Sequence, residues 1–329
     1  MSDLLSIGRT ALNAYSTALA TTSNNVANAA TPGFSRQRVD FATQPPNGLL
    51  GNGVMPAQVR RINDTFLQAR LTDDGAAAAR HGSARELLIR ADRMLSDPLS
   101  GIAAPLQSLN TAVQAVMADP ASLAARSVLL AEAGGVADRF AQLDASYAQL
   151  DREIDGRVSE SVGIANGLVD NIARLNQRIA QSTPGNNGLP PGDLLDQRDE
   201  AVRQLAEQIG VTTLIQSNGS LSVFLEDGQP LVLDGQARHL SVVPTSSAGR
   251  YRLELDSPGG PVAVGRPAGG AIAGLLDARA QAVDAPRAAL ATLATDIATA
   301  FNAAQGAGQD LDGNPGAALF NDPPLSVAI

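Results

Sequence analysis

The most constraining feature of this chain is one long apolar stripe in the middle of its sequence. Its members recur every three or four positions, the spacing of one face of an α-helix: Val136, Phe140, Leu143, Tyr147, Leu150, Ile154 and Val158, then Leu168, Ile172, Leu175 and Ile179. Asp119-Pro120 predicts the start of this helix and Thr183-Pro184-Gly185 its end, with a shift of phase near Gly163 and Gly167. We therefore predict a mainly α fold organised as a long helical bundle.

Local signals predict three further helices. Ser83-x-x-Glu86 has the pattern of a capping box, for a helix that runs to about Leu95. A second helix is indicated by the spacing of Leu195, Arg198, Val202, Leu205 and Ile209. Gly210 is expected to close it. A third helical pattern covers 271–301, with Pro286 as a kink or a helix start.

The helical spacing gives way to β-branched runs at Val211. Turn pairs follow at Asn218-Gly219, Asp227-Gly228 and Asp234-Gly235. Alternating runs joined by such pairs are typical of hairpins. Residues 211–267 therefore predict a small antiparallel β meander.

The N-terminal stretch has the spacing of a coiled-coil helix. From Leu4 to about Ala30 it lacks Pro and carries a heptad seam: Leu5, Gly8, Leu12, Tyr15, Leu19, Thr22, Val26 and Ala29. Arg9 is the only charged residue between Asp3 and Arg36, so the helix is poorly equipped to stand alone in water. Two interpretations stay open, a helix docked on its own domain and a helix for assembly. On the second, we expect an interface of Leu5, Leu12, Tyr15, Leu19 and Val26.

The helix is predicted to stop at Thr31-Pro32-Gly33, because Pro disfavours helical geometry in the preceding residue and Gly permits a sharp turn. An extended loop follows. It contains short strand candidates at 38–41 and 54–59, with turn signals at 44–48 and 51–53.

Five segments are predicted along the chain. They are an N-terminal assembly helix and turn motif (1–35), an extended loop with the long helical bundle (36–210), the antiparallel meander (211–267), a helix that returns to the bundle (268–305), and a terminal loop (306–329). No internal repeat of 20–50 residues is visible, so we do not expect a solenoid.

Charge and composition exclude several classes of partner. Acidic residues outnumber basic ones, 33 against 24, and the net charge of −9 repels nucleic acid and anionic lipid. Arg60-Arg61 and the pair Arg36 and Arg38 lack interleaved aromatics and predict a solvated face. No run reaches the roughly 18 apolar residues of a membrane-spanning helix. Because no basic leader precedes an apolar run at the start, we expect no cleaved signal peptide.

Residues that could support catalysis or hold a metal are scattered. Cysteine is absent, and the two histidines, His81 and His239, lack a spacing that brings a second ligand or a nucleophile beside them. The carboxylate pairs Asp73/Asp74 and Asp199/Glu200 are expected on exposed helical segments. Asp310-x-Asp312-x-Asn314 imitates a calcium loop but lacks its Gly and its final Glu, and predicts a turn. We expect no catalytic, cofactor or metal site, and no enzyme.

One stretch carries a strong family signal. Residues 23–36 read SNNVANAATPGFSR, which resembles the N-terminal signature of flagellar rod, hook and hook-associated proteins. The form with Thr-Pro-Gly, an aromatic and Ser-Arg resembles the hook-associated protein 1 family in particular. The motif residues are Ser23, Asn24, Asn25, Asn28, Thr31, Pro32, Gly33, Phe34 and Arg36. Residues 193–199 (DLLDQRD) and Phe301-Asn302 leading to 310–314 are also similar to that family.

The resemblance implies a structural subunit of the bacterial flagellum at the junction of hook and filament. Its implied partners are copies of itself in a ring, the hook protein, the second junction protein and the export apparatus, and its implied location is extracellular, at the hook tip. In that family the first and last helices pair as a coiled coil, and an outer β domain precedes the last helices. On this resemblance, the chain is expected to lack the family's C-terminal half.

Two other functions remain as alternatives. A secreted helical adaptor would use the stripe over 136–179 to bind a partner helix. A hydrolase would need a clustered His and carboxylate site, which the positions of His81 and His239 do not favour.

Overall fold

The computed structural model of the protein describes residues 2–45, 52–96, 101–183, 190–216, 218–233, 235–245, 251–309 and 313–321. Part of the turn signals at 44–48 and 51–53, and the residues Asp234 and Asp310 to Asp312, lie outside the described residues.

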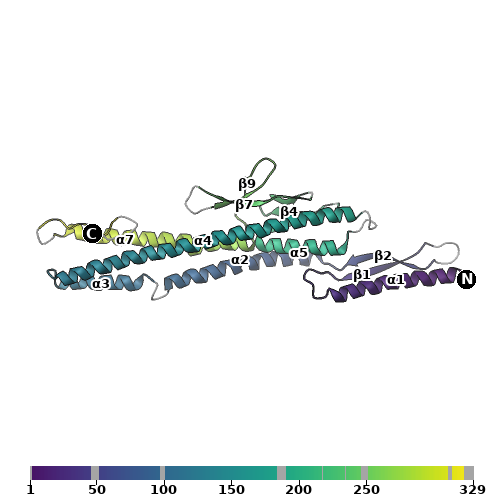
Figure 1. Ribbon diagram of the computed structural model, residues 1–329, viewed down its shortest axis with the longest axis horizontal. Coiled ribbons are helices and arrows are strands. Elements are labelled where there is room, and N and C mark those ends of the chain that lie inside the picture. Colours follow the sequence, from purple (N-terminus) through teal and green to yellow (C-terminus); the bar gives the residue numbers. More distant parts are fainter. Residues whose placement is uncertain are drawn as a thin grey trace. The chain divides into compact units, whose positions relative to one another are not determined.

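Helices dominate the described residues, and the predicted fold class, mainly α with small antiparallel sheets, is confirmed (Figure 1). The α-helices are α1 (Ser2–Ala27), α2 (Thr65–Ser96), α3 (Ala103–Ala118), α4 (Leu123–Ser182), α5 (Gly192–Gln208), α6 (Gly270–Ala278) and α7 (Ala285–Ala307), and a π-helical turn, η2 (Arg279–Asp284), joins the last two. α3 was not predicted from the sequence.

The strands form three antiparallel sheets within the described residues. They are β1 (Gln37–Thr43), β2 (Val54–Arg61), β3 (Val211–Ile215), β4 (Leu221–Leu225), β5 (Pro230–Leu233), β6 (Gln236–Ala237), β7 (Leu240–Pro244), β8 (Tyr251–Leu255) and β9 (Val262–Ala263). β1 pairs with β2, β3 to β6 make a four-stranded sheet, and β7 to β9 make a three-stranded sheet.

The chain divides into two compact units. Unit 1 contains residues 1–79, 161–244 and 251–270, and unit 2 contains residues 80–160, 245–250 and 271–329. Since α2 and α4 each contribute residues to both units, sequence segments and compact units do not coincide. The five segments proposed from the sequence stay a prediction.

α4 is one unbroken helix of 60 residues, and its stripe is buried. The shift of phase is at 150–162, earlier than predicted, because three steps of four follow Leu150: Ile154, Val158 and Val162 are the next positions of the buried stripe. Ala165 and Val169 continue the stripe, whereas Leu168 is only half-buried. The helix is capped by Ser122, whose Oγ accepts from the Ala125 N–H at 3.2 Å.

The predicted capping box at Ser83 is wrong. α2 runs through this position without a break, and Ser83 Oγ donates to the carbonyls of Arg80 and Ala271, each at 3.1 Å. Gly274 packs so closely here that a Cβ would lie 2.0 Å from the Arg80 carbonyl oxygen. The close approach of α2 and α6 in unit 2, which the local sequence pattern does not report, determines the role of this serine.

Pro286 is in the first turn of α7, directly after η2. A proline cannot donate to the carbonyl four residues before it and crowds that carbonyl, which accounts for a wider turn here. In η2, Arg279 is buried between two carboxylates of α4, at 2.8 Å from Asp151 and 2.9 Å from Asp155. Burial raises the pKa of Asp155 above its ordinary value.

Two asparagines of α4 fix the sheets of unit 1. Asn166 Nδ2 donates to the Leu240 carbonyl at 2.9 Å, and its Oδ1 accepts from the Leu240 N–H at 2.8 Å. Asn176 makes the same two-bond contact with Leu221, at 2.7 and 3.0 Å. Each amide therefore satisfies both backbone groups at the start of a strand.

Candidate functional site

One face of α1 packs on the β1–β2 hairpin, and Figure 1 shows the helix beside the two strands. Small and polar residues make this face. Ala14 is fully buried. Gly53 of the hairpin lies so close to Thr10 that a Cβ added to Gly53 would be 2.2 Å from Thr10 Oγ1. Asn25 brackets the backbone of Gln37, because its Nδ2 donates to the carbonyl and its Oδ1 accepts from the N–H, both at 2.8 Å.

The large apolar residues of α1 lie on another face and are exposed. We call this set the apolar ridge: Leu5 (77% exposed), Leu12 (73%), Tyr15 (68%), Leu19 (69%) and Val26 (73%). Tyr15 also touches Phe41 of β1, with ring centroids 5.9 Å apart. α1 thus docks on its own unit through its small residues and leaves the heptad seam uncovered.

The motif after α1 forms a compact hydrogen-bonded turn. Asn28 Nδ2 donates to the side chain of Asn24 at 2.8 Å, and Thr31 Oγ1 donates to Asn28 Oδ1 at 3.2 Å. Gly33 has φ +78°, and a Cβ there would lie 2.8 Å from Glu200 Cβ. Only glycine fits both the left-handed backbone and the contact with α5.

The motif meets α5 through a cluster of charged and polar residues, which we call the α5 latch: Ser35, Gln37, Arg61, Asp193, Asp196 and Asp199. Arg61 lies 2.6 Å from Asp196 Oδ1 and 2.8 Å from Asp199 Oδ2, and Asp196 Oδ2 accepts from the Ser35 N–H at 3.1 Å. Gln37 Nε2 donates to Asp193 Oδ1 at 3.0 Å. The latch therefore joins the stretch 23–36 to the stretch 193–199, two of the segments that resemble the family.

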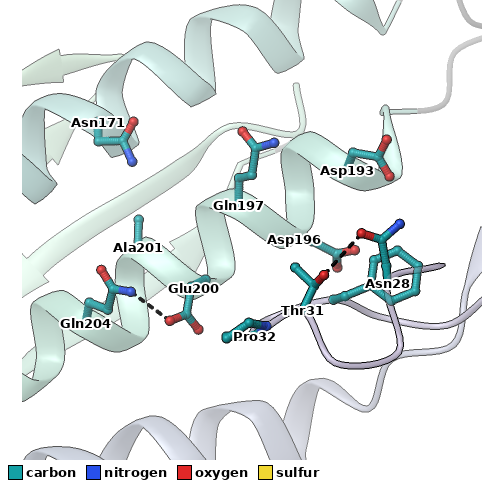
Figure 2. Close-up of a pocket in the computed structure, with 11 residues that line it drawn as sticks. Asn28, Thr31, Pro32, Asn171, Asp193, Asp196, Gln197, Glu200, Ala201 and Gln204 are labelled. Atoms are coloured by element: carbon teal, nitrogen blue, oxygen red, sulfur yellow. Dashed lines mark hydrogen bonds between the residues drawn. The ribbon is translucent and has the colours of Figure 1, made fainter. Parts of the chain in front are cut away.

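A polar cavity of about 420 Å³ lies between the motif turn and α5. Figure 2 shows Asn28, Thr31 and Pro32 on one side and Asp193, Asp196 and Glu200 on the other. Hydrogen bonding from Arg203 holds the pKa of Glu200 below its ordinary value. The carboxylates that line the cavity already have partners, because Asp193 and Asp196 bind side chains of the latch and Glu200 binds Arg203.

Arg198 extends the latch toward the sheet. Its side chain is buried and Nη1 donates to the Gly219 carbonyl at 2.8 Å, at the turn between β3 and β4. Asp199 Oδ1 lies 3.9 Å from its Nε. Burial lowers the pKa of Arg198, because the charged form loses water that these partners replace only in part.

Three expectations about charged residues need correction. Arg61 was predicted on a solvated face and is almost buried, and Asp199 and Glu200 were expected to be exposed but are only partly so. Sequence reasoning missed Arg61 and Asp199 because they pair with each other across 138 positions. It missed the burial of Glu200 because Gly33, which is far away along the chain, packs against that side chain. The spacing in residues 193–200 (DLLDQRDE) contained the signal, since Asp193, Asp196 and Glu200 recur at three and four positions on one helix face.

Both histidines, His81 and His239, are exposed. His239 Nε2 lies 2.9 Å from Asp170 Oδ1 on the surface of unit 1. Across the described ranges, His, Asp and Glu gather nowhere in a group of three suited to a metal ion. None of the described helices combines the length and the apolar character that crossing a membrane requires.

Comparisons with known proteins agree on one family. A model of the flagellar hook-associated protein FlgK helical domain matches residues 88–320, and a model of the flagella basal body rod protein matches residues 5–34. Flagellar hook-associated protein 1 of Salmonella typhimurium is 33% identical over 330 residues, and that of Escherichia coli K12 is 32% identical over 333. These matches cover 98% and 97% of this chain and 60% of each relative, so the chain spans about three fifths of their length.

A solved structure is also similar. The flagellar hook junction protein FlgK from Burkholderia pseudomallei superposes with a TM-score of 0.71 at 30% sequence identity. The match covers 77% of this chain and 46% of that one.

Proposed function

Because this chain belongs to the flagellar hook-associated protein FlgK family, we propose that it is a structural subunit of the bacterial flagellum that forms the junction between hook and filament. In this role it has no enzymatic activity. Its place is outside the cell at the hook tip, reached through the flagellar export apparatus.

The apolar ridge is the observation that carries this proposal. Five large side chains of one helix are more than two thirds exposed, although the same helix is docked on its own hairpin. Each contributes about 1.5–3 kcal/mol when it is fully buried. A contiguous exposed ridge of this kind is typical of an assembly surface, and we assign it to contacts with neighbouring helices in a ring of identical subunits.

The α5 latch supports the same role. An assembly helix must be presented at a defined angle, and the latch ties the chain that leaves α1 to α5 through buried ion pairs. The motif residues Asn24, Asn25, Asn28, Thr31, Gly33 and Phe34 shape that exit within unit 1. The hook protein and the second junction protein are the partners we propose below and above the ring.

The adaptor alternative is not favoured. It required the stripe over 136–179 to face a partner, but every member of that stripe except the half-buried Leu168 is buried within the protein, with Tyr147, Ile154 and Ile172 fully so.

Motility of a strain that depends on this protein tests the proposal. Leu12→Asp combined with Leu19→Asp should abolish filament growth, because two charges interrupt the ridge, while the purified variant should keep the helical content and urea midpoint of wild type. Ala20→Asp is the matched control, since Ala20 is exposed on a different face of the same helix. Normal filaments with the double variant would overturn the assembly role of the ridge.

A further inference from the structure

Asparagine is followed directly by glycine at three places within the described residues: Asn52-Gly53, Asn166-Gly167 and Asn218-Gly219. Such a pair can lose the side-chain amide of the asparagine, because glycine has no Cβ to keep its backbone nitrogen away from the preceding side chain. For this reaction the glycine nitrogen must come to about 3–3.5 Å from Cγ of the asparagine. Hydrogen bonds that hold either group in place therefore slow the reaction.

The pair Asn166-Gly167 is held at both groups. Asn166 uses its Nδ2 and its Oδ1 on the backbone of Leu240, at 2.9 and 2.8 Å. Gly167 lies inside α4, where the backbone N–H groups bond along the helix. Neither the amide nor the nitrogen is free to react while α4 is folded.

The pair Asn218-Gly219 is also held. Asn218 Oδ1 accepts from the Ser220 N–H at 2.9 Å and from Ser220 Oγ at 2.6 Å. The Gly219 N–H donates to the Gln216 carbonyl at 3.0 Å. This turn must open before the nitrogen of Gly219 can attack the side chain of Asn218.

The pair Asn52-Gly53 lies directly before β2 and differs from the other two. No described residue hydrogen-bonds to the side chain of Asn52 or to the N–H of Gly53. Only the Gly53 carbonyl is engaged, by the Gln44 N–H at 3.0 Å. Both residues of the pair are half-buried, so water and base reach them in the folded protein.

We propose that Asn52 is a site of spontaneous deamidation and isomerisation in the folded protein. The Gly53 nitrogen gives its proton to a base and attacks Asn52 Cγ. A C–N bond forms there while the bond from Cγ to Nδ2 breaks, and Nδ2 takes up a proton and leaves as ammonia. Water then opens the resulting succinimide ring at either of its two carbonyls. One opening gives aspartate, and the other gives isoaspartate, in which the main chain runs through the side-chain carbon.

The product alters the contact between the hairpin and α1. Gly53 lies so close to this helix that a Cβ would be 2.2 Å from Thr10 Oγ1 and 3.5 Å from the Cα of Ile7. Isoaspartate adds one methylene to the main chain directly before Gly53. A closely packed contact cannot absorb an added methylene without a shift, so isomerisation at Asn52 loosens the docking of α1. This inference rests on the geometry of unit 1 and not on the proposed function.

Peptide mass spectrometry of the full chain tests the proposal. The chain has no lysine, so trypsin cuts only after arginine and places the three pairs in the peptides 39–60, 158–174 and 204–238. In folded protein kept at mildly alkaline pH, Asn52 should deamidate at least about tenfold faster than Asn166 or Asn218. Fragment ions distinguish Asn52 from Asn47, which is in the same peptide.

The same incubation in guanidinium chloride is the control, because the unfolded chain holds none of the three pairs. The three rates should then be similar. The proposal is wrong if Asn52 reacts no faster than Asn166 in the folded protein. It is also wrong if the ratio of these two rates is the same with and without guanidinium chloride.

Asn52→Gln tests the consequence for α1, because glutamine keeps the amide but must close a larger ring and reacts far more slowly. Before incubation the variant and wild type should agree in urea midpoint and in amide exchange. After incubation, wild type should show the lower midpoint and faster exchange over residues 7–14 of α1. Isoaspartate at position 52 with unchanged exchange in α1 would contradict the coupling.

Discussion

Arg61 of β2 and Asp196 of α5 form an almost buried ion pair of 2.6 Å that holds the N-terminal motif on unit 1. Asp196 also accepts a hydrogen bond from the Ser35 N–H, so one carboxylate binds both the hairpin and the turn. The side chains keep only 11% and 8% of their exposure, and removing either partner leaves the other charged and poorly solvated.

Arg61→Ala should therefore destabilise the protein by about 3 kcal/mol. Urea unfolding followed by circular dichroism measures this. Arg60→Ala is the matched control, because Arg60 pairs with Asp40 at 3.3 Å while its own side chain is 55% exposed. That variant should cost less than about 1 kcal/mol, and equal losses would argue against a special role for the latch.

Gly33→Ala should cost about 2 kcal/mol, since alanine disfavours the left-handed backbone and its Cβ would meet Glu200 at 2.8 Å. Gly228→Ala separates the two causes. Gly228 has φ +85°, but no heavy atom lies within 4 Å of a Cβ there. It should cost about 1 kcal/mol, and a Gly33 variant no worse than this control would show that α5 yields to the methyl group.

Gly274→Ala should destabilise the contact of α6 with α2 in unit 2 by about 3 kcal/mol or more, because the Cβ would lie 2.0 Å from the Arg80 carbonyl and 2.2 Å from Ser83 Oγ. Gly82→Ala is the control, on the same α2 helix with open space around it. That change should stabilise the protein by up to about 1 kcal/mol. The difference in urea midpoint between the two variants measures the effect.

Stability should fall in acid partly through Glu200. Arg203 lowers its folded-state pKa below the ordinary 4.5, so the unfolded chain binds the proton more readily and the contribution of Glu200 is lost as pH falls through the folded value. Glu200→Gln should flatten the decline of the urea midpoint below about pH 4.5. Arg203→Met should flatten it too, because it removes the donor. A constant offset from wild type between pH 7 and pH 3 would rule out this linkage.

The local sequence determined most of the helical segments. Apolar spacing predicted α1, α4 and α5, and turn pairs predicted the sheets, because these signals arise from residues within one or two turns of each other. It also identified the seam of α1. No helix was predicted between Leu95 and Asp119, where the structure has α3.

The tertiary structure decided what the charged and small residues do. Ser83 has the local pattern of a cap but bonds the backbone of α6, and Arg61 has the pattern of a solvated pair but is held between Asp196 and Asp199. Burial and pairing depend on partners more than a hundred positions away, which the residues beside them in the sequence cannot report. The sequence thus determined that α1 carries an apolar ridge, and folding decided that its small residues, and not the ridge, face the hairpin.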